Sequence, residues 1–347
     1  MKIAGNIDTV SVLSDADFNA FYYNRKPVVI KGGLEGTTCF SKWSVNYLKE
    51  KIGSATVRVA YTEKGSYNYA IREVKWIGGP FDEVSDLFTL PASKGTSYYL
   101  AQLSIPGFFP MLMDDLEIPA FIRDGDILDK VNLWMGGAGC DSGLHYDNSH
   151  NFFYQVCGRK DMVLFSPEDT SLLYPSQLPG KWHMSEVELH DADVEQFPLF
   201  LQAQPYHCIV EPGDIIYIPT GWWHNVLSLD MSVSVNFWWH RFDIPIGKGI
   251  DMFSVPELSS FLQRFLQKGV DIDQPDAEGE SLLMRAVDKG HVNFVDALLR
   301  NGASLASVNR KGESPVECAQ KNGRRDIAGL LLKHAEQEAD IKKLEKH

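Results

Sequence analysis

Cysteine is scarce in this chain of 347 residues, and the few cysteines form no recognisable pattern. There are five, an odd number, and no two of them form a Cys-x-x-Cys pair. Thiolate zinc sites and the disulfide frameworks of small secreted domains both need paired cysteines, so the sequence argues against each. Unpaired thiols are typical of a reducing compartment, and we expect an intracellular protein of the cytoplasm or the nucleus.

Long hydrophobic runs and a surplus of basic residues are missing as well. No stretch of about 18 consecutive apolar residues occurs, so we expect no transmembrane helix. Asp8 interrupts the N-terminal residues before the apolar part of a signal peptide could form. The chain has 33 Lys and Arg against 46 Asp and Glu, a formal net charge of −13. This balance disfavours binding to phosphate backbones or anionic lipid, so we expect no membrane partner and favour protein over nucleic acid.

Apolar residues are plentiful, at 44% of the chain with 12% aromatic, which is enough for a packed core. Short strand-like runs separated by turns dominate the region from about 130 to 240. We therefore predict a mainly β fold, a double-stranded β-helix of the jelly-roll or cupin type, with flanking helices at 43–52 and 81–88. The predicted strands are 131–135, 152–157, 162–165, 206–210, 214–218, 225–229 and 232–238.

Candidate metal ligands lie within this region. His145 and Asp147 form a His-x-Asp pair, and alternate residues of an extended segment point to the same face, so the two can chelate one ion. His224 follows a turn, a buried strand-like run and a Pro-Thr-Gly break, which places it at a strand boundary. Two imidazoles and one carboxylate are the ligand set of non-haem iron(II) oxygenases. His150 is an alternative zinc partner for His145, although a spacing of five puts them on opposite faces of a strand.

Further motifs surround these ligands. They are His-Tyr-Asp at 145–147, Asn-Phe-Phe at 151–153, Gly-Arg-Lys at 158–160, Val-Leu-Phe-Ser-Pro at 163–167, Tyr-Ile-Pro at 217–219, Trp-Trp-His at 222–224 and Val-Asn-Phe-Trp at 235–238. As a set they resemble the JmjC-type, cupin-fold 2-oxoglutarate oxygenases, and the asparaginyl hydroxylases of the factor-inhibiting-HIF type in particular. Weaker similarity extends the resemblance over about residues 10–240.

The resemblance implies that His145, Asp147 and His224 bind iron(II), with 2-oxoglutarate and O2 as cosubstrates. It also implies that Lys160 pairs with the distal carboxylate of 2-oxoglutarate. The surrounding residues support that role, because a lysine between two apolar runs is partly desolvated and needs an anionic partner to stay charged. The alternative is a solvent-facing lysine on an edge strand.

Five more residues match positions around the cosubstrate. By resemblance, Ser142 and Tyr99 would each donate a hydroxyl to 2-oxoglutarate. Asn151 and Asn236 would lie beside the metal and the cosubstrate's C1 carboxylate. Trp238 would form a wall of the pocket, with simple core packing as the alternative.

The resemblance is incomplete on the substrate side. The polar pair that binds the target asparagine in factor-inhibiting-HIF-type enzymes corresponds here to His183 and Met184, so asparagine specificity does not follow. Residues 163–167, 198–200 and 224–226 are also similar to the JmjC hydroxylase that modifies wybutosine in tRNA. Because Asp147 fills the carboxylate position, the resemblance favours hydroxylation, or demethylation through hydroxylation, over halogenation.

A second pattern begins after residue 250. Lys-Gly-Val-Asp at 268–271 recurs as Asn-Gly-Ala-Ser at 301–304, and Glu-Gly-Glu-Ser at 278–281 recurs as Lys-Gly-Glu-Ser at 311–314, each at a spacing of 33. This spacing is the ankyrin period. We therefore predict an oxygenase domain over 1–250 with its core at about 130–240, a small all-α domain of about two and a half ankyrin repeats over 256–336, and a charged tail at 337–347.

The leading interpretation is an iron(II)- and 2-oxoglutarate-dependent dioxygenase that hydroxylates a side chain of a protein substrate. The ankyrin repeats would serve as a protein-docking or dimerisation surface. The alternatives are a tRNA- or RNA-modifying hydroxylase of the same fold, a histone or protein lysine demethylase, and a non-catalytic cupin–ankyrin interaction protein. An intact set of metal ligands together with Lys160 argues against the last of these.

Overall fold

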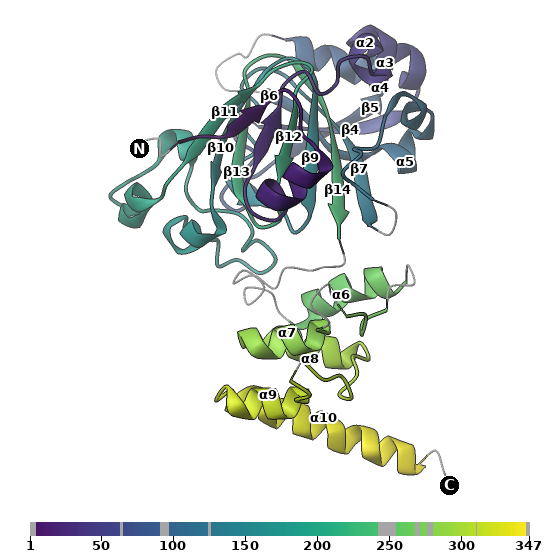
Figure 1. Cartoon of the computed structure of the whole chain (residues 1–347). Coiled ribbons are helices and arrows are strands. Elements are labelled where there is room, and N and C mark those ends of the chain that lie inside the picture. The colour runs from purple at the N-terminus through teal and green to yellow at the C-terminus, as the bar shows by residue number, and fades with distance from the viewer. Residues whose placement is uncertain are drawn as a thin grey trace. The chain divides into compact units, whose positions relative to one another are not determined.

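The structure is a computed structural model, and it describes residues 5–62, 65–90, 97–123, 126–241, 255–267, 271–275, 280–309 and 311–344. The chain divides into two compact units, Met1–His240 and Arg241–His347. All labelled strands belong to the first unit, and the second unit is drawn as helices (Figure 1). Each unit has its own hydrophobic core, so each is described by itself.

Two β-sheets form the first unit. In the part of the chain that the structure describes, the smaller sheet has the order β1 (Gly5–Asn6), β11 (Tyr206–Val210), β10 (Lys160–Phe165), β13 (Trp223–Ser228) and β8 (His145–Tyr146). The larger has the order β2 (Asp8–Val10), β3 (Val28–Ile30), β12 (Ile215–Ile218), β9 (His150–Cys157), β14 (Ser232–His240), β7 (Ile127–Gly136), β6 (Ser97–Ser104), β4 (Thr56–Thr62) and β5 (Lys75–Pro80).

The seven strands predicted between residues 130 and 240 are all present, as β7 and β9 to β14. The largest difference between a predicted and an observed strand boundary is at β7, which begins at Ile127 instead of residue 131. Strands distant in sequence lie side by side: β14 pairs with both β7 and β9, and β10 pairs with β13. The predicted mainly β class with a separate helical part is therefore confirmed.

Alternate side chains of the larger sheet enter two different cores. On β9, Phe152 and Tyr154 pack toward the helices, whereas Phe153 packs into an inner cluster. That inner cluster joins the sheets, because it contains Ile216 of β12 and Met162 of β10. This two-residue period decides which side chains face the interior between the sheets.

Short helices cover the outer face of the larger sheet. The predicted helix at 43–52 is present as α3 (Val45–Ile52), which Ser44 caps by accepting a hydrogen bond from the Tyr47 N–H. The helix predicted at 81–88 is shorter: α4 (Phe81–Val84) continues as the 3-10 helix η2 (Ser85–Thr89). Figure 1 shows α2 (Thr38–Lys42), α3 and α4 grouped beside β4 and β5. The remaining helical segments of this unit are α1 (Asp15–Asp17), α5 (Ile105–Phe108), η1 (Phe18–Tyr22), η3 (Pro110–Asp115), η4 (Pro167–Leu172), η5 (Leu189–Asp191) and η6 (Pro198–Gln202).

The second unit consists of α6 (Val255–Leu266), α7 (Leu282–Lys289), α8 (Val292–Arg300), α9 (Pro315–Lys321) and α10 (Arg325–Leu344) within the described residues. Ser281 and Ser314, at the predicted spacing, cap α7 and α9 by accepting hydrogen bonds from the N–H groups of Met284 and Glu317. Parts of the repeated motifs, 268–270 and 278–279, lie outside the described residues. Most of the predicted tail belongs to α10, which extends to Leu344.

Candidate metal centre

Strand pairing brings the three candidate ligands together. His145 on β8 lies opposite His224 on β13 in an antiparallel pair, and their ring centroids are 4.3 Å apart. Asp147 follows β8, and its Oδ2 is 3.6 Å from His224 Nε2. One ligand atom from each residue lies within 4.8 Å of the others, and this is the group that could hold a metal in the part of the chain that the structure describes. His145 and Asp147 thus share one side, as their spacing predicts.

Backbone carbonyls orient both imidazoles. The Nδ1 atom of His145 is 2.9 Å from the Gly143 oxygen, and that of His224 is 3.0 Å from the Trp222 oxygen. A carbonyl only accepts, so each Nδ1 carries the ring proton and each Nε2 keeps a lone pair for a metal. Burial, followed by the charge of His224, lowers the pKa of His145 to about 4. His145 is therefore neutral at physiological pH, as metal ligation requires.

A partly buried carboxylate joins the two segments that carry the candidate ligands. Asp141 Oδ1 accepts hydrogen bonds from the Gly143 N–H, at 2.8 Å, and from Asn225 Nδ2, at 2.5 Å. Gly143 in turn accepts from His145, and Asn225 adjoins His224. Burial raises the pKa of Asp141. The Asp141 carboxylate therefore fixes the backbone on both sides of the candidate metal position.

Lys160 is buried in the interior between the sheets. Its side chain is 1% exposed, and Nζ lies 5.1 Å from the ring centroid of Phe153 and 5.8 Å from that of Tyr99. Within the described residues, its ammonium has no carboxylate at ion-pair distance. Burial lowers its pKa to about 8. The lysine is thus far more desolvated than a residue on a solvent-facing edge strand, and an anion beside it would restore its charge.

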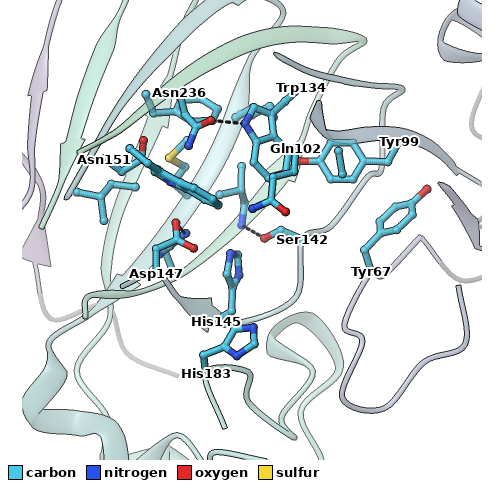
Figure 2. Close-up of a pocket in the computed structure, with 18 of the residues that line it drawn as sticks. Tyr67, Tyr99, Gln102, Trp134, Ser142, His145, Asp147, Asn151, His183 and Asn236 are labelled. Atoms are coloured by element: carbon cyan, nitrogen blue, oxygen red, sulfur yellow. Dashed lines mark hydrogen bonds and ion pairs between the residues drawn. The ribbon is translucent and has the colours of Figure 1, made fainter. Parts of the chain in front are cut away.

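One pocket of about 200 Å³ collects all of the predicted site residues (Figure 2). They are Tyr99, Ser142, His145, Asp147, Asn151, Lys160, His224, Asn236 and Trp238. Three buried polar atoms of these pocket residues have no hydrogen-bond partner among the described residues. They are Asn151 Oδ1, Asn236 Nδ2 and Trp238 Nε1. Unpaired donors, a buried ammonium and a His-Asp-His group in one cavity fit a divalent metal together with a small anionic chelator.

The two predicted hydroxyl donors differ in their present partners. Ser142 Oγ accepts from the Val226 N–H at 3.0 Å and donates to the Gly143 oxygen at 3.0 Å, so its proton is already engaged. Tyr99 is 7% exposed, and burial raises its pKa well above the usual value. Tyr99 therefore keeps its proton and stays a donor, whereas Ser142 would have to rotate to donate into the pocket.

Trp134 and Gln102 also line the pocket, although the sequence did not single them out (Figure 2). Trp134 lies on β7, a strand that carries none of the predicted site residues, so nothing near it in the sequence pointed to the pocket. Gln102 has φ +56° at a β-bulge in β6, a backbone state that is costly for a residue with a side chain. Bulges of this kind redirect side chains beside active sites.

Other candidate residues occupy different places. His150 does not join the ligand group: its Nδ1 is 2.9 Å from the Tyr217 hydroxyl, and its ring packs on Tyr23 and Trp239. His150 begins β9 in the larger sheet whereas His145 lies on β8 in the smaller one, so in the described residues the two do not belong to one ligand group. His183 and Met184 do line the pocket. They carry no amide, so the pair differs from the polar pair of the asparaginyl hydroxylases.

Comparison with known proteins follows the same division of the chain. A family model described as a cupin-like domain matches residues 14–243. The chain belongs to this family. A second, described as ankyrin repeats in three copies, matches residues 255–343. The predicted cupin fold and ankyrin repeats are thereby confirmed.

The curated relatives are JmjC proteins. Lysine-specific demethylase 8 of Xenopus tropicalis is 36% identical over 218 residues, 62% of this chain and 48% of the relative. The tRNA wybutosine-synthesizing protein 5 of Gallus gallus is 34% identical over 236 residues, 63% of this chain and 71% of the relative. The Jumonji C domain-containing protein 5 of Drosophila melanogaster is 33% identical over 225 residues, 62% of this chain and 54% of the relative. The chain spans about half the length of the first and third of these.

These relatives support membership of the JmjC-type 2-oxoglutarate oxygenase superfamily, whose members generally use iron(II) and 2-oxoglutarate. They do not specifically support the narrower resemblance to factor-inhibiting-HIF-type hydroxylases. In the described ranges, no helix combines the length and the apolar character needed to cross a membrane.

Proposed function

We propose that this protein is an iron(II)- and 2-oxoglutarate-dependent dioxygenase that hydroxylates a side chain of a protein substrate. The observation that carries the proposal is the buried ammonium of Lys160 in the same pocket as His145, Asp147 and His224. A metal alone would not need a buried cation nearby. A metal-chelating dicarboxylate needs both, because its far carboxylate must be neutralised when it leaves water.

Each residue has a distinct task in this proposal. His145 and His224 offer neutral Nε2 atoms to iron(II), and Asp147 offers the negative oxygen. Lys160 binds the distal carboxylate of 2-oxoglutarate, and Tyr99 donates its hydroxyl to the same molecule. When bound, iron(II) and 2-oxoglutarate would activate O2, one oxygen atom going into a substrate C–H bond and the other into the succinate left after loss of CO2 from 2-oxoglutarate.

The remaining residues shape the pocket around that chemistry. Asn151 and Asn236 present amide groups beside the metal and the C1 carboxylate of 2-oxoglutarate. The aromatic side chains of Phe153, Trp134 and Trp238 line the pocket and would exclude water from it.

The charge of the chain favours a protein substrate. Each phosphate contact normally requires a Lys or Arg, and acidic residues outnumber basic ones by 46 to 33. The segment after the pocket residue Met184 is acidic, and it contains Glu186, Glu188, Asp191, Asp193 and Glu195. A polypeptide offers backbone groups that need no basic patch. In this proposal the ankyrin repeats serve as a docking or dimerisation surface for protein.

Two alternatives draw on specific relatives. Similarity to a tRNA wybutosine-synthesizing protein over 71% of that protein favours an RNA substrate. Similarity to lysine-specific demethylase 8 favours demethylation of a lysine side chain through hydroxylation. Both share the proposed metal and cosubstrate, so they differ from the main proposal only in the substrate.

The proposal can be tested in two steps. First, the protein is titrated with iron(II) and 2-oxoglutarate under anaerobic conditions, and succinate is measured after oxygen is admitted. Second, stimulation of 2-oxoglutarate turnover by a cell extract is compared after separate protease and ribonuclease treatment, with mass spectrometry of the modified product. Stimulation that ribonuclease abolishes and protease leaves intact would overturn the protein substrate. A gain of 16 Da on a peptide, without loss of methyl groups, distinguishes hydroxylation from demethylation.

We further propose an intracellular site of action, in the cytoplasm or the nucleus. All five cysteines carry free thiols. A reducing compartment would preserve both these thiols and iron in its divalent state.

A further inference from the structure

The side-chain amide of Asn236 is held in one orientation by its neighbours. Asn236 lies on β14 and is 1% exposed. Its Oδ1 accepts hydrogen bonds from Trp134 Nε1 at 2.7 Å and from Asn132 Nδ2 at 3.2 Å. Figure 2 shows the bond between Trp134 and Asn236 at the edge of the pocket. Both donors come from β7, where Asn132 lies directly opposite Asn236 and Trp134 lies diagonally across.

The chemistry of indole decides which amide atom faces Trp134. An indole N–H only donates, so the atom opposite it must be the carbonyl oxygen. The Nδ2 group then points away from β7, where it is buried without a hydrogen-bond partner among the described residues. A rotated amide would set two donors against each other at 2.7 Å and would lose both hydrogen bonds to Oδ1.

We propose that Trp134 is a positioning residue that presents the Asn236 amide N–H to an acceptor oxygen of the bound cosubstrate. The inference rests on the proposed function, because that acceptor belongs to 2-oxoglutarate. A cosubstrate oxygen accepts a hydrogen bond from the amide N–H, whereas a rotated amide would oppose two oxygen lone pairs. Trp134 therefore acts through Asn236 and touches neither the metal nor the reacting bond.

Packing keeps the indole where this role requires it. The Trp134 ring lies 5.8 Å from the centroid of Tyr99 and 6.4 Å from that of Trp238. Both neighbours also line the pocket. A Trp134→Phe substitution keeps an aromatic ring in this contact but removes the N–H, so it isolates the hydrogen bond from the packing.

The test measures binding of 2-oxoglutarate to the full chain loaded with manganese(II), a redox-stable substitute for iron(II), by calorimetry. Trp134→Phe is expected to weaken 2-oxoglutarate binding about 3- to 10-fold, the effect of one neutral hydrogen bond. Manganese affinity should be unchanged. Trp76→Phe, at an exposed tryptophan on β5 outside the pocket lining, is the matched control and should leave both affinities unchanged.

A double-mutant cycle separates positioning from a general structural role. In an Asn236→Ala background, Trp134→Phe should have no further effect, because the amide that it orients is gone. Asn236→Asp provides a second test that does not depend on the folding of the Trp134 variant. It should weaken binding more than Asn236→Ala, because it places a carboxylate oxygen where the amide N–H pointed.

The outcomes distinguish this inference from the proposed function. If the unsubstituted protein binds manganese but no 2-oxoglutarate, the proposed function fails and the inference fails with it. If it binds 2-oxoglutarate and Trp134→Phe binds equally well, only the inference is overturned. An equal loss from Trp134→Phe in the presence and absence of the Asn236 amide would likewise assign Trp134 to packing alone.

Discussion

His145 and His224 lie directly opposite each other on paired strands, with ring centroids 4.3 Å apart, although they belong to distant parts of the sequence. The pairing of β8 with β13 therefore sets the distance between two candidate metal ligands. A shift of one residue in this register would turn one imidazole to the other face of the sheet. The metal site depends on strand register as much as on residue identity.

Removal of one ligand should abolish metal-dependent turnover with the fold intact. We expect His224→Ala to lose iron(II) binding and 2-oxoglutarate decarboxylation, because two remaining ligands cannot hold the ion firmly. Calorimetric titration with iron(II) under anaerobic conditions measures the first effect, and succinate formation measures the second. Full turnover in an Asp147→Ala, His224→Ala double variant would show that the metal binds elsewhere.

Lys160→Ala should weaken 2-oxoglutarate binding by roughly 10- to 150-fold, the effect of one buried, charge-assisted hydrogen bond. Metal affinity should persist, because Lys160 is not a ligand. Lys26→Ala, at an exposed lysine paired with Asp8, is the control. An unchanged dissociation constant for 2-oxoglutarate in the Lys160 variant would leave the buried ammonium without the proposed role.

Binding of 2-oxoglutarate should also weaken at alkaline pH. Burial lowers the pKa of Lys160 to about 8 in the ligand-free protein. A bound carboxylate favours the ammonium and raises that pKa, so above about pH 8 binding must take up a proton. Affinity is then expected to fall by up to about tenfold per pH unit above pH 8 and to stay level below about pH 7. Lys160→Arg stays charged throughout. An equal decline of 2-oxoglutarate affinity with pH in Lys160→Arg would contradict the assignment of Lys160 as the titrating group.

Asp141→Ala should weaken metal binding by about 10- to 100-fold, the usual range for residues that orient metal ligands. The substitution removes the acceptor shared by Gly143 and Asn225, and so loosens the backbone beside both histidines. Asp141→Asn keeps one acceptor oxygen and should recover part of the affinity. Asp161→Ala, which removes the partner of His207, is the matched control. If Asp141→Ala bound the metal as tightly as the unsubstituted protein, this role for Asp141 would be excluded.

Two glycines of the ankyrin unit should respond in opposite directions to alanine. Gly290 ends α7 with φ +84°, so Gly290→Ala should lower the free energy of unfolding by about 1 kcal/mol or more. Gly329 is exposed within α10, with open space around an added Cβ. Gly329→Ala should raise that free energy by about 0.5–1 kcal/mol. Hydrogen exchange of residues 280–344 during denaturant titration measures both. Equal effects of the two substitutions on the free energy of unfolding would contradict the assignment of Gly290 to the end of α7.

The local features of the protein could be predicted from its residues alone. Short strand-like runs separated by turns predicted the seven strands between 130 and 240. The spacing of two between His145 and Asp147 put both on one face, and the repeat of 33 residues that includes Ser281 and Ser314 predicted the ankyrin helices. Each of these signals lies within a few neighbouring residues or in a repeat of fixed period.

The relations between distant segments became known from the three-dimensional fold. It excluded His150 as a ligand, placed Trp134 against Asn236 and joined Asp141 to Asn225. It also showed that Lys160 is buried rather than on a solvent-facing edge. These relations depend on which strands pair and in which register. Strand pairing is set by the packing of the whole sheet, so no local pattern around a single residue contains it.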